Sequence, residues 1–188
     1  MRDITSQDRI EEFLKTLNMD QELSPADFDR AIKSAYQDRT RQVFFIWKAI
    51  KDLHPDIDAN EIIRLGSKNF GLYQGKKIAE KAGSSSLSPI EALLGQTSRG
   101  GYSVFKQEII KLEENEAIKF FNACPHVEAL QEMGLNQEEV KSFCKDMLIA
   151  CDYGIVEAFQ DLKIEFPTTV SEGEGKPCQM IISRDETC

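Results

Sequence analysis

The sequence FFNACPH at residues 120–126 joins a predicted strand to a predicted helix. The residues that lead into it, Ala117-Ile118-Lys119-Phe120-Phe121, form the strand. Proline cannot donate a hydrogen bond within a sheet, so the strand is expected to end at Cys124-Pro125 and to turn its cysteine toward whatever lies beyond the sheet edge. His126 to Met133 is then a short helix, closed by Gly134.

A second strand is predicted just before this one. Val104 to Leu112 and Ala117 to Phe121 flank the polar run Glu113-Glu114-Asn115-Glu116, which indicates two strands joined by a turn. Further strands are predicted downstream, over Lys163 to Val170 and Lys176 to Ile182. Helices followed by strands favour an α+β fold over alternating α/β. We therefore expect a mainly helical N-terminal half packed on an antiparallel sheet formed mainly by residues after 102.

The N-terminal half is predicted to be helical. Residues 1–22 form a helical extension, in which Ser6 to Leu17 is amphipathic, and residues 23–188 form a single α+β domain. A long, aromatic-rich helix is expected up to the stop at His54-Pro55, and Arg99-Gly100-Gly101 is expected to end the helical half. The detached first helix and the long helix offer surface for pairing, which predicts a homodimer.

The next predicted helix begins at Asp58 and contains Gly66, Gly71 and Gly75. Glycine costs about 1 kcal/mol relative to alanine in a helix interior. Three glycines therefore indicate that another backbone or a ligand approaches this helix closely. Close packing against a second helix is the simpler of the two interpretations.

The composition argues against several classes of partner. The 188-residue chain has a formal charge of -9 and a pI near 4.9, which disfavours nucleic acid and anionic membrane surfaces, because phosphate is bound chiefly by lysine and arginine. The N-terminus opens polar and charged, and no apolar run approaches the roughly 20 residues that span a bilayer. A cytoplasmic protein with a small-molecule ligand or a protein partner is therefore expected.

Cysteine and histidine are concentrated in the C-terminal half. Four of the five cysteines and one of the two histidines lie within 55 consecutive residues, Cys124 to Cys178. In an unexported chain these thiols are expected to be reduced, which favours metal binding or catalysis over disulfides. The last strand of an antiparallel sheet can lie beside the strand that ends at Cys124. We therefore expect Cys124, Cys144 and Cys178 to converge on one site, with ordinary burial of each thiol as the alternative.

Several segments resemble a known family. They are Asn122-Ala123-Cys124-Pro125, Phe143-Cys144, Cys151-Asp152-Tyr153-Gly154 and residues 171–182, with Arg64-Leu65-Gly66 and Gly71 to Gly75 upstream. Over residues 58–182 the chain resembles the L-2-amino-thiazoline-4-carboxylic acid hydrolase family. It is more distantly similar to the four-vinyl reductase domain, a small-molecule binding module whose cysteines hold zinc. Two zinc ligands of that module would fall near Pro167 and Val170, whose side chains cannot bind metal, so that zinc site is not intact here.

The first resemblance implies an enzyme that opens a thiazoline ring, and two routes are open. The ring carbon between nitrogen and sulfur needs a nucleophile, and the departing atom needs a proton. In the first route Cys124 or Cys144 supplies a thiolate, while His126 is base and acid. Asp152 then orients the histidine. In the second route zinc keeps an open position for water, whose pKa falls to about 7, and is held by three of Cys124, His126, Cys144 and Cys178.

A carboxylate substrate requires a local cation in so acidic a chain. Arg64 and Lys68 on the glycine-containing helix are the candidate substrate-binding residues, together with Lys76.

The alternative function is a binding or sensor module without catalysis. A structural cysteine or zinc site would then brace an apolar pocket lined by Phe44, Trp47, Phe70 and Phe120. A closed four-ligand metal site would indicate this structural role. Three ligands with an open position, or a metal-free thiol beside His126, would indicate chemistry.

Overall fold

Two long helices make up most of the N-terminal half. The computed structural model describes residues 24–173 and 175–185, and the helix predicted at Ser6 to Leu17 lies outside them. Helix α2 spans Pro25–Leu53 and helix α3 spans Ala59–Ala82. No helix in the described ranges is long and apolar enough to cross a membrane. The structure describes a single chain, so the homodimer stays a prediction.

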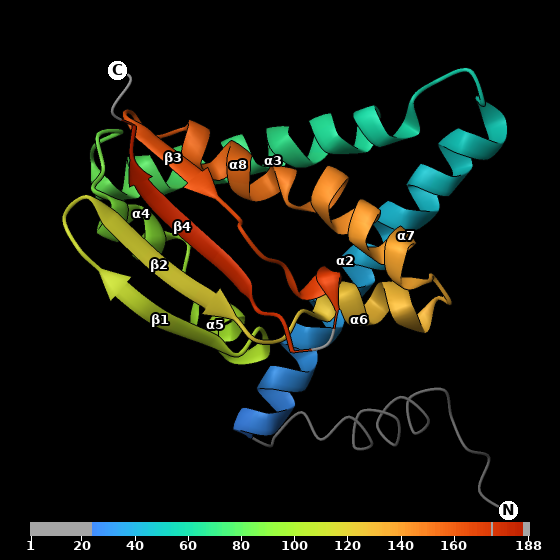
Figure 1. Cartoon of the computed structure of the whole chain (residues 1–188), viewed down its shortest axis with the longest axis horizontal. Helices are drawn as coiled ribbons and strands as arrows, with labels where there is room; N and C mark the ends of the chain where they lie inside the picture. Colours follow the sequence, from blue (N-terminus) through green and yellow to red (C-terminus); the bar gives the residue numbers. More distant parts are fainter. Residues whose placement is uncertain (1–23, 174, 186–188) are drawn as a thin grey trace, which may run out of the picture.

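The sheet has four antiparallel strands in the order β1-β2-β4-β3 (Figure 1). Its strands are β1 Gln107–Leu112, β2 Glu116–Phe121, β3 Leu162–Glu165 and β4 Cys178–Arg184. The predicted α+β fold is therefore confirmed, as is the turn between the first two strands. Because β4 pairs with β2, Cys178 lies opposite Phe121. The start of β4 is thus close to the segment that leads to Cys124.

Shorter helices connect the strands and cover the sheet. They are α4 Pro89–Gly95, α5 Arg99–Val104, α6 Pro125–Glu132, α7 Gln137–Ser142, the π-helix η1 Phe143–Leu148, α8 Ala150–Glu157 and the 3-10 helix η2 Val170–Glu172. The helix predicted from Asn136 to about Leu162 is thus interrupted by a π-helical turn and ends at Glu157. Such turns widen the helix locally and are frequent at functional sites. Here the turn contains Cys144 and directly precedes α8.

The prediction that Arg99-Gly100-Gly101 ends the helical half is wrong, because this segment begins α5. Ser98 caps the helix, and its hydroxyl accepts a hydrogen bond from the backbone N–H of Gly101 at 3.1 Å. A Cβ added at Gly100 would lie 3.1 Å from the side chain of Ile32 on α2. The glycine therefore allows α5 to pack closely on α2, and this contact outweighs the low helix propensity of glycine.

Helices α3 and α8 lie side by side with their backbones in contact (Figure 1). A Cβ added at Gly71 of α3 would lie 1.9 Å from the carbonyl oxygen of Cys151 on α8. In the opposite direction, a Cβ added at Gly154 of α8 would lie 2.1 Å from the carbonyl oxygen of Lys68 on α3. Both distances are far below van der Waals contact, so neither position has room for a side chain.

The glycines of α3 differ in what surrounds them. A Cβ added at Gly75 would lie 2.3 Å from the carbonyl oxygen of Ile155, so Gly75 and Gly71 both confirm the predicted close approach of another backbone. Gly66 is exposed, and a Cβ there would meet nothing within 4 Å. The prediction is therefore wrong for Gly66.

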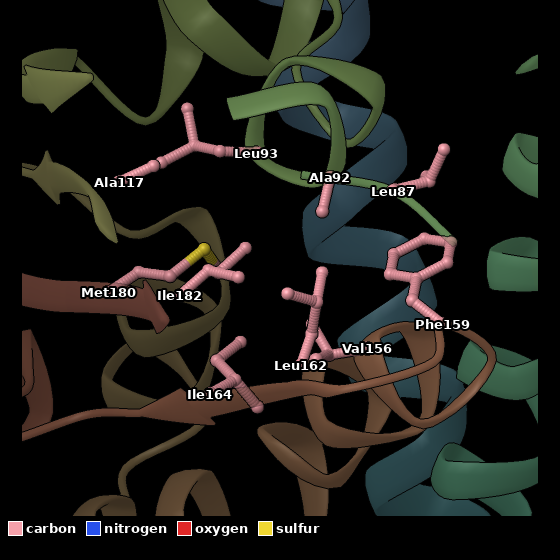
Figure 2. Close-up of a cluster of buried hydrophobic side chains, with 10 residues drawn as sticks. All are labelled: Leu87, Ala92, Leu93, Ala117, Val156, Phe159, Leu162, Ile164, Met180 and Ile182. Atoms are coloured by element: carbon pink, nitrogen blue, oxygen red, sulfur yellow. The ribbon is translucent and has the colours of Figure 1, made fainter. Parts of the chain in front are cut away.

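Two clusters of buried apolar side chains hold these elements together. The first lies between the sheet and helices α4 and α8, and Figure 2 shows its side chains pointing toward one another. Its buried members are Leu87, Ala92, Leu93, Ala117, Val156, Phe159, Leu162, Ile164, Met180 and Ile182. The second cluster joins α3, α6, α7 and the π-helix η1, through Ile63, Val127, Leu130, Val140, Phe143 and Met147. Phe44 and Trp47 pack against the second cluster, so these two predicted pocket residues belong to the core.

Candidate active site

A cavity of about 420 Å³ brings the predicted site residues together. Its wall includes all five residues predicted for chemistry or metal binding, namely Cys124, His126, Cys144, Asp152 and Cys178. They come from the segment after β2, from α6, from the π-helix, from α8 and from β4. The exposed residues Arg39 and Phe70 also line the cavity and mark where it meets solvent.

Cys124 lies at the N-cap of α6, where the backbone N–H groups of His126 and Val127 face its sulfur. This position favours a thiolate, because the N-terminal end of a helix is positive. Burial has the larger effect and raises the pKa of Cys124 to about 12. The thiol is therefore protonated at neutral pH in spite of the helix.

The other thiols of the cavity are protonated for the same reason. Burial raises the pKa of Cys178 to about 11 and that of Cys151 to about 12, and it raises the pKa of Cys144 as well. Charges on Cys124 and Cys178, which line the same cavity, would raise the pKa of Cys144 further. The four cysteines in the described ranges are all free. The cavity thus has a wall of neutral thiols.

A chain of hydrogen bonds determines which nitrogen of His126 carries the proton. The buried hydroxyl of Thr40 donates to the carbonyl oxygen of Tyr36 at 3.0 Å. The same hydroxyl oxygen lies 2.6 Å from Nδ1 of His126. A hydroxyl has one proton and a carbonyl can only accept, so Nδ1 must donate to Thr40. The other ring nitrogen, Nε2, is therefore unprotonated.

The His126 ring is neutral and held in place. Burial, with a contribution from the positive charge of Arg39, lowers the pKa of His126 to about 3. The ring centroid lies 5.6 Å from that of Tyr36 and 5.5 Å from that of Phe105. A pKa so far below 7 makes His126 a weak base at neutral pH, although Nε2 can still accept a hydrogen bond.

Asp152 supplies the carboxyl group of the cavity. It lies in the first turn of α8, just after the π-helical turn. Burial raises the pKa of Asp152 to about 6, although the positive charges of Lys119 and Arg39 act in the opposite direction. The carboxyl group therefore changes its charge near neutral pH, which a catalytic acid or base requires.

Lys119 is a buried cation of the cavity that was not predicted. It is 1 % exposed, and its Nζ donates to the hydroxyl of Thr97 at 3.3 Å and lies 5.1 Å from the ring centre of Phe121. Burial lowers the pKa of Lys119 to about 8, and the nearby charge of Asp152 opposes this shift. The sequence alone did not distinguish it. Side chains alternate along a strand, so Lys119 shares one face of β2 with the apolar Ala117 and Phe121, but Ile118 and Phe120 make the opposite face equally apolar.

Several further polar residues line the cavity without having been predicted, among them Arg39, Gln96 and Gln107. The side-chain oxygens of Gln96 and Gln107 are buried and have no hydrogen-bond partner among the described residues. The guanidinium of Arg39 lies 5.7 Å from the ring centre of Tyr36 and 5.6 Å from that of Phe70. Nothing in the local sequence pattern distinguishes these residues from ordinary surface glutamine and arginine.

The predicted substrate-binding residues do not line this cavity. Arg64 donates two hydrogen bonds to Glu61, at 2.7 and 2.6 Å, and Nζ of Lys68 forms an ion pair with Glu157 at 2.7 Å. Both cations line a separate depression of about 540 Å³. They lie on a different face of α3 from the residues that line the first cavity, Phe70, Gln74 and Ile78.

The structure does not support the predicted zinc set. Among the described residues, no group of three or more His, Cys, Asp or Glu side chains is placed to hold a metal ion. The set in question was Cys124, His126, Cys144 and Cys178. Of these, His126 directs Nδ1 to Thr40, and Cys178 accepts a hydrogen bond from the backbone N–H of Val170 at 3.2 Å.

Comparison with known proteins gives one finding. The family model described as L-2-amino-thiazoline-4-carboxylic acid hydrolase matches residues 28–182, from the start of α2 to β4. Neither the comparison with curated proteins nor the comparison with solved structures gives a match. The matched range contains every residue of the cavity wall. This chain therefore belongs to the L-2-amino-thiazoline-4-carboxylic acid hydrolase family.

Proposed function

We propose that this protein hydrolyses the ring of a 2-amino-thiazoline in the cavity described above. The name of its family supports a hydrolase-type enzyme. The observation that carries the proposal is the pair formed by the half-buried Asp152 and the buried Lys119, which face one cavity with pKa values of about 6 and about 8. Buried titratable groups whose pKa values are shifted toward neutrality are characteristic of catalytic sites.

The reaction needs one nucleophile and two proton transfers. Water forms a bond to the ring carbon between nitrogen and sulfur and loses a proton to a base. The bond from that carbon to the ring nitrogen or to the sulfur then breaks, and the departing atom takes a proton. One water molecule is consumed and no redox partner is required. A single carboxyl group that first accepts and then donates a proton can serve both steps.

Asp152 is the group proposed to move this proton. Its pKa of about 6 leaves it mostly as a carboxylate at neutral pH, which can take the proton from water. The raised pKa also makes this carboxylate a stronger base than that of an exposed aspartate. Lys119 keeps a positive charge close to the developing negative charge. His126 is assigned a positioning role, because its ring stays neutral and Nε2 can accept a hydrogen bond from the ligand.

Water is preferred over a thiol as the nucleophile. The pKa of every thiol in the cavity is raised, so a thiolate route would begin with an unfavourable deprotonation. Asp152 contributes to the raised pKa of Cys151 and of Cys178 but is not among the charges that act on Cys124. The carboxylate that acts on Cys124 is that of Glu128, and its charge raises the pKa of the thiol further.

Cys124→Ala is therefore expected to keep most of the ring-opening activity. Cys144→Ala serves as the matched variant, because it removes a second thiol from the same wall. The rate of each variant is measured with 2-amino-thiazoline-4-carboxylate, and folding is checked by thermal unfolding. A folded Cys124→Ala protein without turnover would instead assign the attack to this sulfur.

The proposed function itself is tested by direct turnover. Purified protein is incubated with 2-amino-thiazoline-4-carboxylate, and ring opening is followed by mass spectrometry as the gain of one water. Elemental analysis of the same preparation tests the earlier prediction of zinc.

A binding module without catalysis is the second candidate. The neutral state of the thiols and of His126 favours it, since none of them is activated as a nucleophile or strong base. Saturable binding of the thiazoline without any gain of water would establish this function in place of hydrolysis.

A further inference from the structure

Two buried amide oxygens in the cavity wall have no partner. The side-chain oxygens of Gln96 and Gln107 are buried, and among the described residues nothing donates a hydrogen bond to them. Gln107 is 9 % exposed, and Gln96 uses its own N–H to bond the carbonyl oxygen of Ala92 at 3.1 Å. An unpaired buried carbonyl is unfavourable by about 1–3 kcal/mol, so native structures rarely keep one without a reason. A ligand that donates N–H groups would satisfy both.

Lys119 presents unused donors at the same place. An ammonium group has three N–H donors. Within the described residues, its hydrogen bond to a protein oxygen is the one to Thr97 at 3.3 Å, and Thr97 directly follows Gln96. Gln107 lies opposite Phe121, over whose ring the ammonium sits. One end of the cavity therefore combines two free acceptors with a cation that has free donors.

We infer that this end of the cavity binds the amino-acid portion of the ligand. Lys119 pairs with a carboxylate, and the oxygens of Gln96 and Gln107 accept hydrogen bonds from the protonated amidine of the ligand, whose ring N–H lies on the adjacent carbon and whose amino group supplies further N–H donors. This inference rests on the proposed function for the identity of the ligand, because 2-amino-thiazoline-4-carboxylate carries its carboxylate on the carbon next to the ring nitrogen.

The arrangement also explains how an acidic protein binds an acid. The formal charge of the chain is -9, so a carboxylate is repelled at long range and must be recognised by a local charge. A buried ammonium pairs more strongly with an anion than an exposed one, because water screens it less. Arg39, at the exposed side of the cavity, can attract the ligand before it enters.

The test uses a probe that the protein cannot hydrolyse. Thiazolidine-4-carboxylate keeps the carboxylate and the neighbouring ring N–H but lacks the amidine carbon, and thiazolidine lacks the carboxylate as well. Binding of both probes is measured by calorimetry on the full chain and on Lys119→Met. We expect Lys119→Met to weaken the binding of thiazolidine-4-carboxylate by about 10- to 100-fold, which is the range for the loss of a hydrogen bond to a charged group. The affinity for thiazolidine should be unchanged.

Two further variants separate binding from folding. Gln107→Leu removes an unpaired oxygen, so it should lower the affinity for both probes several-fold. The unliganded variant should unfold at the same temperature as the wild type or at a higher one. Lys111→Met, on the neighbouring strand β1, removes a half-buried cation that pairs with Glu113 and Glu116 and does not line the cavity, so it should change neither affinity. A structural role for Gln107 would instead lower the unfolding temperature.

The outcomes are distinct from those that test hydrolysis. Equal binding of thiazolidine-4-carboxylate to Lys119→Met and to the wild type would overturn the inference, as would an equal loss of affinity for both probes or no binding of either probe to the wild type. If the predicted binding pattern is found but no turnover occurs, the inference stands and the hydrolase proposal fails.

Discussion

Asp152→Asn is expected to lower the rate of ring opening by about 10²- to 10⁴-fold, the usual contribution of a general acid-base group. Asparagine keeps the size and shape of the aspartate but can neither accept the proton of water nor return it to the departing atom. Ligand binding should be retained, because the inferred contacts to the amino-acid portion come from Lys119, Gln96 and Gln107. The loss should therefore appear in kcat, with little change in KM.

Glu157→Gln is the matched control for this variant. Glu157 lies on the same helix, but it is exposed and forms an ion pair with Lys68 away from the cavity. Its amide substitution should leave kcat unchanged. Full activity of Asp152→Asn would contradict the assignment of Asp152 as the proton carrier.

The pH dependence of kcat/KM provides a second readout for the same residue. Activity should rise as Asp152 loses its proton around pH 6 and fall as Lys119 loses its proton around pH 8, which gives a bell-shaped profile. The acidic limb should disappear from the residual activity of Asp152→Asn. A profile that lacks the acidic limb in the wild type would argue against Asp152.

The stability of Asp152→Asn should change in the opposite direction to its activity. The folded protein holds the Asp152 proton more tightly than the unfolded chain, whose aspartate titrates near 3.8. This contribution to stability is therefore complete below pH 3.8 and is lost as the pH rises through about 6. The shift corresponds to a free energy on the order of 3 kcal/mol. Asp152→Asn should accordingly be more stable than the wild type at pH 7 to 8, which separates lost catalysis from lost folding.

The parts of the cavity wall that follow from local sequence rules could be predicted only in outline. The strand was expected to end at Cys124-Pro125, but β2 ends at Phe121, three residues earlier, and Pro125 begins α6, since proline suits the first turn of a helix. The pairing of β2 with β4 then places Cys178 opposite Phe121, near Cys124. The expectation that Cys124 and Cys178 lie near each other needed only the order of the elements and the antiparallel direction of the strands.

The polar residues of the cavity depend on tertiary packing and were missed. Lys119 is buried because β2 is covered on that face by α4, and a strand with mixed residues does not reveal which side is covered. Gln96 and Gln107 line the same cavity only because α4 lies against the sheet. The predicted cations Arg64 and Lys68 lie outside this cavity for a related reason, since the face of α3 that meets the cavity is set by its contact with α8.

The π-helical turn was not predicted either, although it determines where Asp152 points. Residues 143–148 carry ordinary helix-forming side chains, and no glycine or proline marks the change. The backbone N–H of Ile149 bonds the carbonyl oxygen of Cys144 at 3.0 Å, five residues earlier. This extra residue in the turn rotates α8 relative to α7, and it allows Cys144 and Asp152 to face one cavity.

Gly71→Ala is expected to destabilise the protein by about 3 kcal/mol, at the upper end of the range for overpacking. The added methyl group would lie 1.9 Å from the carbonyl oxygen of Cys151, and both partners are helix backbone that cannot rotate away. Helices α3 and α8 must therefore separate. Because Cys151 precedes Asp152, this movement also displaces the proposed proton carrier. The measurement is chemical denaturation together with the rate of ring opening at a temperature where the variant is folded.

Gly66→Ala is the matched control on the same helix. Nothing lies within 4 Å of a Cβ at this exposed position, so alanine should add about 1 kcal/mol of stability through its higher helix propensity. The two substitutions are chemically identical, and their opposite signs would isolate the helix contact as the cause. If Gly71→Ala were as stable as Gly66→Ala, α3 and α8 could not be in backbone contact in solution, and the position of Asp152 in the cavity would have to be revised.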